Sequence, residues 1–314
     1  MASQQRNITD ATPIHKLSLD LRGNSFYVKR DDLLPFSFGG NKARKVSYFF
    51  AEILSGEYDT VVTYGSSSSN HCRVVANAAK ANGLACYIVS PEENYIKTYN
   101  SVLVESFGAR IVKAPLDAIS ATIDSLMDEL RSRCKPYFIQ GGGHGNPGTR
   151  AYVDAYREIC DYEEKNGIYF DYVFHASGTG TTQAGLVCGA ALAADEDRKI
   201  VGISIARSLP RGGEVVEESV RSYLDSVGYD GVMPKVIFDD SYICGGYGLF
   251  DEDIVRCIND VMDNDGIPLN RTYTGKAYRG MIEYVKKNGI EGKNILFIHT
   301  GGCPLFFDDM GEEK

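Results

Sequence analysis

The chain has 314 residues, 43% of them hydrophobic and 24% charged, which is enough to bury a large core and predicts two domains or lobes. Its formal net charge of -9 excludes the basic surface that nucleic-acid binding needs. A small anionic substrate is not excluded, because one cationic pocket can outweigh a negative surface.

The sequence disfavours membrane insertion, disulfides and zinc. No apolar run approaches the length of a membrane helix, and the start MASQQRNITD lacks the apolar core of a signal peptide. The eight cysteines form no C-x-x-C pair, and several lie in apolar runs, as Cys188 does. We therefore expect a cytoplasmic protein with buried thiols and no metal site.

Short runs rich in β-branched and aromatic residues alternate with helical patterns along the chain. After residue 42, for example, apolar side chains recur at positions 46, 49, 50, 53 and 54, which is the spacing of one helix face. This alternation predicts an α/β fold with mainly parallel sheets, flanking helices and ligand sites at the carboxyl ends of the strands. The predicted strands span residues 25–30, 60–65, 85–90, 109–114, 136–140, 171–176, 199–206, 235–240 and 294–300.

The segment FGGNKARK, residues 38–45, sets a lysine directly after two glycines and an asparagine. Lysines are mostly surface residues, so Lys42 could simply be the first charge of an exposed helix. It could instead be an amine held for chemistry. Such an amine must be partly deprotonated, and burial and neighbouring cations such as Arg44 and Lys45 would lower its pKa.

The loop YGSSSSNHCR, residues 64–73, lies between a predicted strand and a predicted helix. Four tightly bracketed serines are too few for a flexible linker. Ser69 or Asn70 could cap the helix, or the exposed amides and hydroxyls could hold an anionic group at the helix N-terminus. The loop alone supports both interpretations equally.

A second loop, HASGTGTTQAGL at residues 175–186, also joins a strand to a helix, and its glycines, hydroxyls and N–H groups suit a phosphate. A dinucleotide is disfavoured, because Gln183 occupies the third glycine position of GxGxxG and the next strand ends without an acidic residue. The segment TGKA, residues 274–277, is not a P-loop, since Ala277 replaces its Ser/Thr and Asn270 its earlier glycine.

The third loop, HTGG at residues 299–302, closes the last predicted strand, and we give His299 only a supporting role. One cofactor accounts for the three loops and the lysine together. Pyridoxal phosphate needs a lysine amine for its Schiff base, a phosphate cradle, a partner for the pyridine nitrogen and a hydrogen bond to the ring hydroxyl. Under this interpretation Lys42 is not a surface charge.

Five motifs carry a resemblance to a known family: KRDDLLPFSFGGNKARK, SSSNHCRVVANAA, SGTGTTQAGL, TYTGKAYRGM and LFIHTGG. In the same serial order, from about residue 12 to the HTGG turn, they resemble the D-cysteine desulfhydrase and 1-aminocyclopropane-1-carboxylate deaminase family of pyridoxal-phosphate enzymes. The resemblance implies the two-lobed, tryptophan-synthase-β-like fold (fold type II) and a homodimer. It places a larger cofactor-binding domain at residues 1–43 and 157–314, and a smaller α/β domain at residues 44–156.

The resemblance also implies roles for individual residues. Lys42 would carry the Schiff base, Ser69 would act as nucleophile or base, and Asn70 would bond the ring hydroxyl. Thr274 would face the pyridine nitrogen. The phosphate would be held by Gly178, Thr179, Gly180, Thr181 and Thr182. The substrate would be bound by Ser69, Asn70, His71, Tyr247 and Tyr273, the two tyrosines being catalytic as well.

The chain departs from the family pattern in two segments on the expected substrate side. Serines at positions 67 and 68 replace an apolar–glutamine pair, and QGGGHGNPGTRAY, residues 140–152, replaces a simpler turn. The identity of the cofactor is therefore better defined by the sequence than that of the substrate.

Position 274 separates the two activities of the family. The deaminase branch has glutamate there, and a carboxylate would stabilise a protonated pyridine nitrogen and a strong electron sink. Thr274 leaves the nitrogen largely unprotonated, which suits β-elimination of a good leaving group. We therefore expect a carbon–sulfur lyase that converts a small amino acid, D-cysteine first, to pyruvate, ammonia and sulfide. The alternatives are the deaminase, a β-replacement synthase and a non-catalytic pyridoxal-phosphate carrier.

Overall fold

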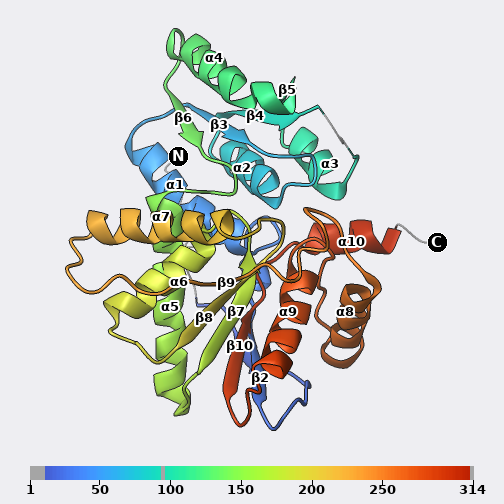
Figure 1. The fold of residues 1–314 in the computed structure, drawn as a ribbon. Helices are drawn as coiled ribbons and strands as arrows, with labels where there is room; N and C mark the ends of the chain where they lie inside the picture. Colours follow the sequence, from blue (N-terminus) through green and yellow to red (C-terminus); the bar gives the residue numbers. More distant parts are fainter. Residues whose placement is uncertain (1–10, 93–95, 312–314) are drawn as a thin grey trace.

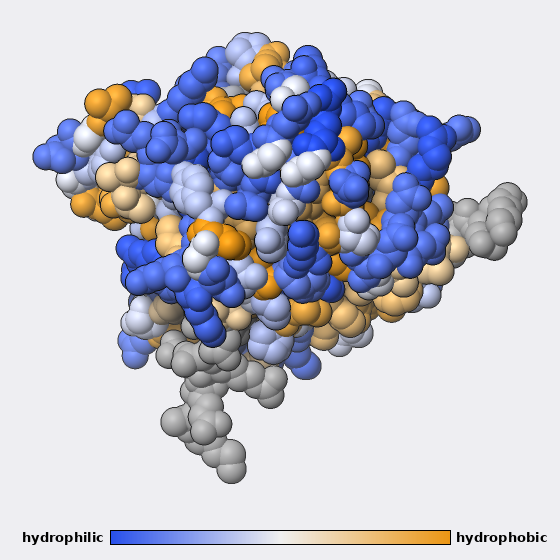
Figure 2. Space-filling view, turned by 90° about the horizontal axis from the view of Figure 1, so that it is seen from below, coloured by the Kyte–Doolittle hydropathy of each residue, from blue (hydrophilic) through white to orange (hydrophobic). Residues whose placement is uncertain are grey.

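The chain forms two β-sheets flanked by helices, in a computed structural model that describes residues 11–92 and 96–311. Figure 1 shows the smaller sheet, with α2, α3 and α4, above the larger one. The expected α/β architecture with mainly parallel sheets is confirmed. In the described ranges no helix is long and apolar enough to cross a membrane. Figure 2 shows one face of the molecule, where hydrophilic residues dominate and hydrophobic ones are scattered among them.

The larger sheet has six strands in the order β1-β2-β10-β7-β8-β9. Only β1 is antiparallel to its neighbour, and the other strands are parallel. Phe297 of β10 lies in register with Val28 of β2 and Phe174 of β7, and all three side chains are buried. The strands are β1 (Ile14–Lys16), β2 (Ser25–Lys29), β7 (Tyr172–Ser177), β8 (Lys199–Ser204), β9 (Ile237–Asp239) and β10 (Asn294–Ile298).

The smaller sheet has four parallel strands in the order β5-β4-β3-β6. They are β3 (Thr60–Tyr64), β4 (Ala85–Pro91), β5 (Arg110–Ala114) and β6 (Pro136–Ile139). All nine predicted strands are therefore present. The one strand that the sequence analysis missed, β1, is a three-residue edge strand with a single buried residue, Ile14, so it carries almost no hydrophobic pattern.

Helices cover both sheets. They are α1 (Asn41–Ser55), α2 (Asn70–Ala81), α3 (Tyr99–Ser106), α4 (Ile119–Arg131), α5 (Asn146–Asn166), α6 (Thr181–Leu192), α7 (Arg211–Ser226), α8 (Glu252–Asp265), α9 (Thr274–Lys287) and α10 (Cys303–Gly311), with short 3-10 turns η1 (Asp31–Leu33) and η2 (Leu116–Ala118). On α1 the predicted apolar face is buried: Val46, Phe49, Phe50 and Ile53 pack into the core beside the smaller sheet. Burying each such side chain contributes about 2 kcal/mol.

A buried ionic network fixes α1 to the larger sheet. The Arg44 guanidinium donates to both Asp31 and Glu158, and Lys29 of β2 donates to Glu158 as well. Tyr152 of α5 donates to Asp31 at 2.6 Å. Helices α1 and α5 thus lie at the junction of the two sheets. The domain boundaries at residues 44 and 156 stay a prediction.

Candidate active site

The carboxyl ends of strands from both sheets open into one cavity of about 510 Å³. Loops that follow β3, β6, β7 and β8 contribute to its wall, together with the first turn of α1. This is the position at which parallel α/β sheets hold their ligands. Seven of the predicted site residues line it: Lys42, Ser69, His71, Gly178, Thr179, Tyr247 and Tyr273.

The amine of Lys42 is held inside this cavity. Helix α1 begins just after Gly40, which has a φ of +89°, and a Cβ at this position would lie only 2.6 Å from the Thr300 carbonyl oxygen, so a side chain has no room. Lys42 Nζ then donates to the carbonyl oxygen of Gly142 at 3.0 Å. Burial lowers its pKa to about 8, against the opposing effect of the Cys72 thiol. Lys42 is therefore not an exposed charge on a solvated helix.

Neither neighbouring cation lowers the pKa of Lys42 as expected, because burial causes that shift. Arg44 was expected to lower the pKa of Lys42, but its guanidinium points into the pair with Asp31 and Glu158, and these carboxylates neutralise it. Lys45 is buried, and burial together with the nearby Lys42 lowers its own pKa. In the described part of the chain, Lys45 has no carboxylate within salt-bridge distance.

The glycine-rich loop after β6 explains the hydrogen bond of Lys42. Gly142 and Gly143 have φ values of +73° and +70°, and the Gly143 N–H donates back to Gln140 O at 3.0 Å. A Cβ on Gly142 would lie 2.6 Å from the Thr179 side chain. Glycine is thus required both by the backbone conformation and by the close approach. The turn presents the Gly142 carbonyl to Lys42.

Ser69 combines the two interpretations that its loop allowed. It is the N-cap of α2, since its Oγ accepts from the Cys72 N–H at 3.2 Å, and the same residue lines the cavity. Capping occupies the oxygen as an acceptor and leaves its O–H to donate elsewhere. The cap and a catalytic role are therefore compatible.

Asn70 and His71 follow Ser69 at the buried start of α2. Asn70 Oδ1 accepts from Asn100 at 3.0 Å. The Thr63 hydroxyl donates to Ile139 O, so it can only accept from His71 Nε2, 2.8 Å away. His71 is then the neutral Nε2–H tautomer, and burial, Lys42 and Lys45 lower its pKa well below its usual value. It is poorly suited to carry a positive charge.

The N-terminus of α6 forms an anion cradle. Gly180, at φ +91°, precedes the helix, and Thr182 Oγ1 accepts from Asn41 at 3.1 Å. Thr181 Oγ1 is buried and has no hydrogen-bond partner among the described residues. An orphaned hydroxyl and the N–H groups of the first turn of α6, which have no partner within the helix, fit a phosphate group. Lys45, which has no carboxylate partner among the described residues, packs beside Gly143 of the adjoining turn.

Tyr247 and Tyr273 meet at the cavity, with their hydroxyl oxygens 2.5 Å apart. Burial and the neighbouring Tyr247 raise the pKa of Tyr273 well above its usual value, so its hydroxyl stays protonated. The next residue, Thr274, is fully buried, and its Oγ1 accepts from both the N–H and the side-chain amide of Asn270, at 2.9 and 3.1 Å. Both acceptor sites of the hydroxyl are used, so its hydrogen is left to donate.

Among the residues that line the cavity and that the sequence analysis did not single out are the ionisable His144, Arg207, Arg211 and Glu218. His144 Nδ1 donates to Thr179 O at 3.2 Å. It lies in the loop that departs from the family pattern, which was the only available signal. His299 has the supporting role that was expected: it accepts a hydrogen bond from the Gly301 N–H at 3.1 Å and donates one to Pro268 O. The side chain of Gln183 accepts from Ser177 and donates to Ile237 O.

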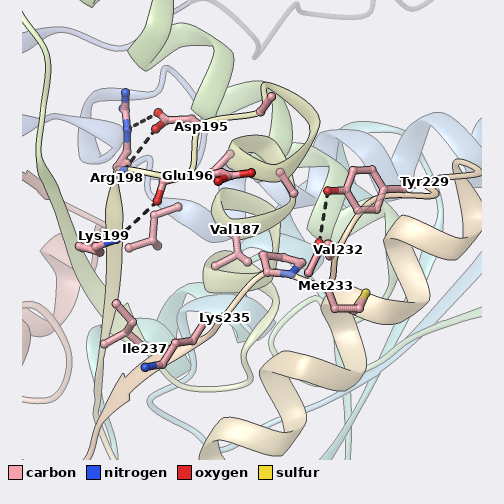
Figure 3. Close-up of a pocket in the computed structure, with 15 residues that line it drawn as sticks. Val187, Asp195, Glu196, Arg198, Lys199, Tyr229, Val232, Met233, Lys235 and Ile237 are labelled. Atoms are coloured by element: carbon pink, nitrogen blue, oxygen red, sulfur yellow. Dashed lines mark hydrogen bonds and ion pairs between the residues drawn. The ribbon is translucent and has the colours of Figure 1, made fainter.

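A second cavity, of about 330 Å³, lies at the carboxyl end of α6. Figure 3 shows it between Val187 and the loop that carries Tyr229, Val232 and Met233. None of the predicted site residues lines it, and its wall is mainly apolar with charged groups at the rim. The larger cavity around Lys42 is therefore the candidate active site.

Comparison with known proteins agrees with this geometry. The family described as pyridoxal-phosphate dependent enzyme matches residues 3–301. A D-cysteine desulfhydrase of Serratia proteamaculans is 33% identical over 96% of this chain and 94% of its own length. A Pyrococcus abyssi protein, provisionally named a 1-aminocyclopropane-1-carboxylate deaminase, is 35% identical over 96% and 92%. The crystal structure of an ACC deaminase homologue is 31% identical, with a TM-score of 0.85 over 96% of this chain and 93% of that one.

Proposed function

The chain belongs to the family of pyridoxal-phosphate dependent enzymes, and from this premise we propose that it is a β-eliminating lyase of the D-cysteine desulfhydrase type. Its cofactor is pyridoxal 5'-phosphate, its fold is type II of these enzymes, and it falls in the D-cysteine desulfhydrase and 1-aminocyclopropane-1-carboxylate deaminase group. The proposed reaction converts D-cysteine, or a small relative with a comparable leaving group, to pyruvate, ammonia and sulfide.

One observation carries the choice between the two activities: the hydroxyl of Thr274 can only donate. Because Asn270 occupies both of its acceptor sites, Thr274, if it faces the pyridine nitrogen, would offer it a hydrogen and favour the unprotonated ring. A glutamate at this position would favour the protonated ring instead, since an opposite charge stabilises the charged form. When bound, pyridoxal phosphate withdraws electrons from the substrate's Cα, and an unprotonated ring does so less strongly. That weaker sink suits a substrate whose β-substituent leaves readily.

The other roles follow from the chemistry of the side chains. Lys42 would hold the cofactor covalently and, once released from it, act as a base, because a pKa of about 8 leaves part of the amine neutral near neutral pH. Ser69 lines the same cavity and is the second candidate to take the Cα proton. Thr181, Lys45 and the N–H groups of α6 would hold the phosphate. Tyr247 and Tyr273 would contact the substrate through their hydroxyls.

Two other reactions compete with this proposal. The deaminase is disfavoured by Thr274, and a β-replacement synthase would trap the eliminated product with a nucleophile. A panel of D- and L-amino acids with β-leaving groups, scored by pyruvate release from the purified holoenzyme, tests the choice. Pyruvate from D-cysteine supports the lyase. A new β-substituted amino acid that forms only after a thiol is added, in place of pyruvate, would support the synthase. We also propose a homodimer, as the family resemblance implies, and a cytoplasmic location, as the sequence suggests. Light scattering of the purified protein tests the dimer.

A further inference from the structure

Lys276, in the first turn of α9, is a fully buried lysine whose hydrogen-bond partners are all main-chain carbonyls. Its Nζ donates to Ile205 O at 2.9 Å, to Ile243 O at 2.8 Å and to Gly246 O at 2.7 Å. An ammonium has three N–H donors, so the three carbonyls satisfy it completely. Within the described ranges no carboxylate lies at salt-bridge distance. Burial lowers the pKa of Lys276, and Cys244 and Asp251 oppose this effect.

A positive charge enclosed by carbonyl oxygens has the environment of a bound monovalent cation. Potassium ions are held in proteins by such oxygens, which replace the hydration shell of the ion. Any buried ammonium needs hydrogen-bond partners, and those of Lys276 are three converging main-chain carbonyls with no carboxylate among them. The side chain of Lys276 therefore functions as a cation that is tethered to α9.

The three carbonyls belong to two segments that both reach the candidate active site, and Lys276 connects these segments. Ile205 follows β8 and lines the 510 Å³ cavity. Ile243 and Gly246 belong to the loop of residues 243–248, in which Tyr247 also lines the cavity. This loop is irregular: Cys244, Gly245 and Gly248 have φ values of +52°, +88° and +77°, and Gly245 and Tyr247 are exposed while the other residues are half-buried. Its one internal backbone bond runs from Gly246 N to Ile243 O, at 3.0 Å.

A loop with so few bonds of its own needs an external anchor to hold a side chain in place. Lys276 supplies two of its bonds to this loop and the third to the end of β8. Tyr273, at the N-cap of the same helix, meets Tyr247 hydroxyl to hydroxyl. The first turn of α9 thus carries one of the two tyrosines and also the group that anchors the other.

We propose that Lys276 is a positioning residue that acts as a built-in monovalent cation: its ammonium clamps the Tyr247 loop to the end of β8 and so fixes Tyr247 against Tyr273. The consequence is specific. Removing the side chain leaves a cage of three carbonyls that a free cation of suitable size can occupy, so the variant becomes dependent on potassium or ammonium, whereas the natural protein does not need either ion.

The test uses the Lys276→Ala holoenzyme, studied with choline chloride, potassium chloride or ammonium chloride at equal ionic strength. Hydrogen–deuterium exchange of peptides that cover residues 240–250 reports the order of the loop without any substrate. We expect faster exchange in choline, and protection restored by potassium or ammonium. With D-cysteine, kcat/KM should fall about tenfold or more in choline and recover with the same ions, as for other groups that orient a site residue. The visible absorbance of the cofactor should change little.

Two further variants make the result interpretable. Lys276→Met keeps a long side chain without charge, so it should loosen the loop and resist rescue, because the side chain fills the cage. Lys286→Ala, on the exposed part of the same helix, removes a lysine paired with Glu283 at 2.9 Å and should behave like the natural protein. The inference is overturned if Lys276→Met keeps the protection of the natural protein, or if choline protects the Lys276→Ala loop as well as potassium does. If Lys276→Ala fails to fold, exchange in Lys276→Met still decides. Because exchange needs no substrate, a wrong substrate assignment would leave this test intact.

Discussion

Replacing Ser69 separates its role as N-cap of α2 from its proposed catalytic role, because glycine can cap a helix without a hydroxyl. The Ser69→Ala variant loses the bond from Cys72 N–H to Oγ, a neutral N-cap at 3.2 Å, which costs about 1 kcal/mol. For a chain of this length that lowers Tm by roughly 1–2 °C. Ser69→Gly also lacks the hydroxyl, but glycine is tolerated at the N-cap and costs only about a few tenths of a kcal/mol.

If Ser69 acts as base or nucleophile, both variants should lose about a hundredfold or more in kcat with D-cysteine, although their stabilities differ. The assay is pyruvate release at saturating D-cysteine, run beside thermal unfolding of the same holoenzyme samples. The absorbance of the bound cofactor should stay near that of the natural protein, since Ser69 is not expected to hold it. A Ser69→Gly variant with nearly full activity would refute the catalytic role and leave Ser69 as a cap alone.

Three further predictions concern the lysine and the ring nitrogen. Lys42→Ala should lose the visible absorbance of the covalently held cofactor and all turnover, whereas borohydride should fix the cofactor to Lys42 in the natural protein; a colourless active enzyme would contradict the account. Burial lowers the pKa of Lys42 to about 8, so its neutral amine predominates above about that pH. The rate at which the apoenzyme captures pyridoxal phosphate should therefore rise with pH and level off above about pH 8, whereas for a lysine with the ordinary pKa of 10.5 it would keep rising to about that pH. Stopped-flow absorbance measures this rate. Thr274→Glu should lower the rate of elimination and give a long-wavelength absorbing species during turnover, because a carboxylate favours the protonated ring; an unchanged spectrum would show that residue 274 does not control the ring.

Local patterns predicted most of the fold. Each of the nine strands was predicted from a run of β-branched and aromatic residues, and all but the edge strand β9, which is half-buried, contain buried side chains. The buried stripe on α1 was predicted from its spacing. β1 was missed because three edge residues carry too little pattern. The loops at strand ends were informative for the same reason: their glycines, serines and threonines stand where a helix begins, so Ser69 and Gly180 could be placed next to helix N-termini before any contact was known.

Long-range contacts account for what the sequence analysis missed. The charge of Arg44 is neutralised in part by Glu158, which lies 114 residues away in the sequence, so no local signal predicted this ion pair. The burial of Lys276 depends likewise on carbonyls 71 and 33 residues distant. His144 sits in a glycine-rich turn whose direction is set by Gly142 packing on Thr179. A lysine or histidine in a sequence carries no sign of its partners, and these residues acquire their function only from the packing.

The most direct test of the central claim compares two substrates on one sample of the natural holoenzyme. D-cysteine is scored by pyruvate and sulfide, and 1-aminocyclopropane-1-carboxylate by 2-oxobutanoate, at matched concentrations. If Thr274 is the donor-only partner of the ring nitrogen that we propose, the enzyme should turn over D-cysteine, or a relative with a comparable leaving group, and should not open the ring. Efficient release of 2-oxobutanoate would contradict the account and make the chain a deaminase.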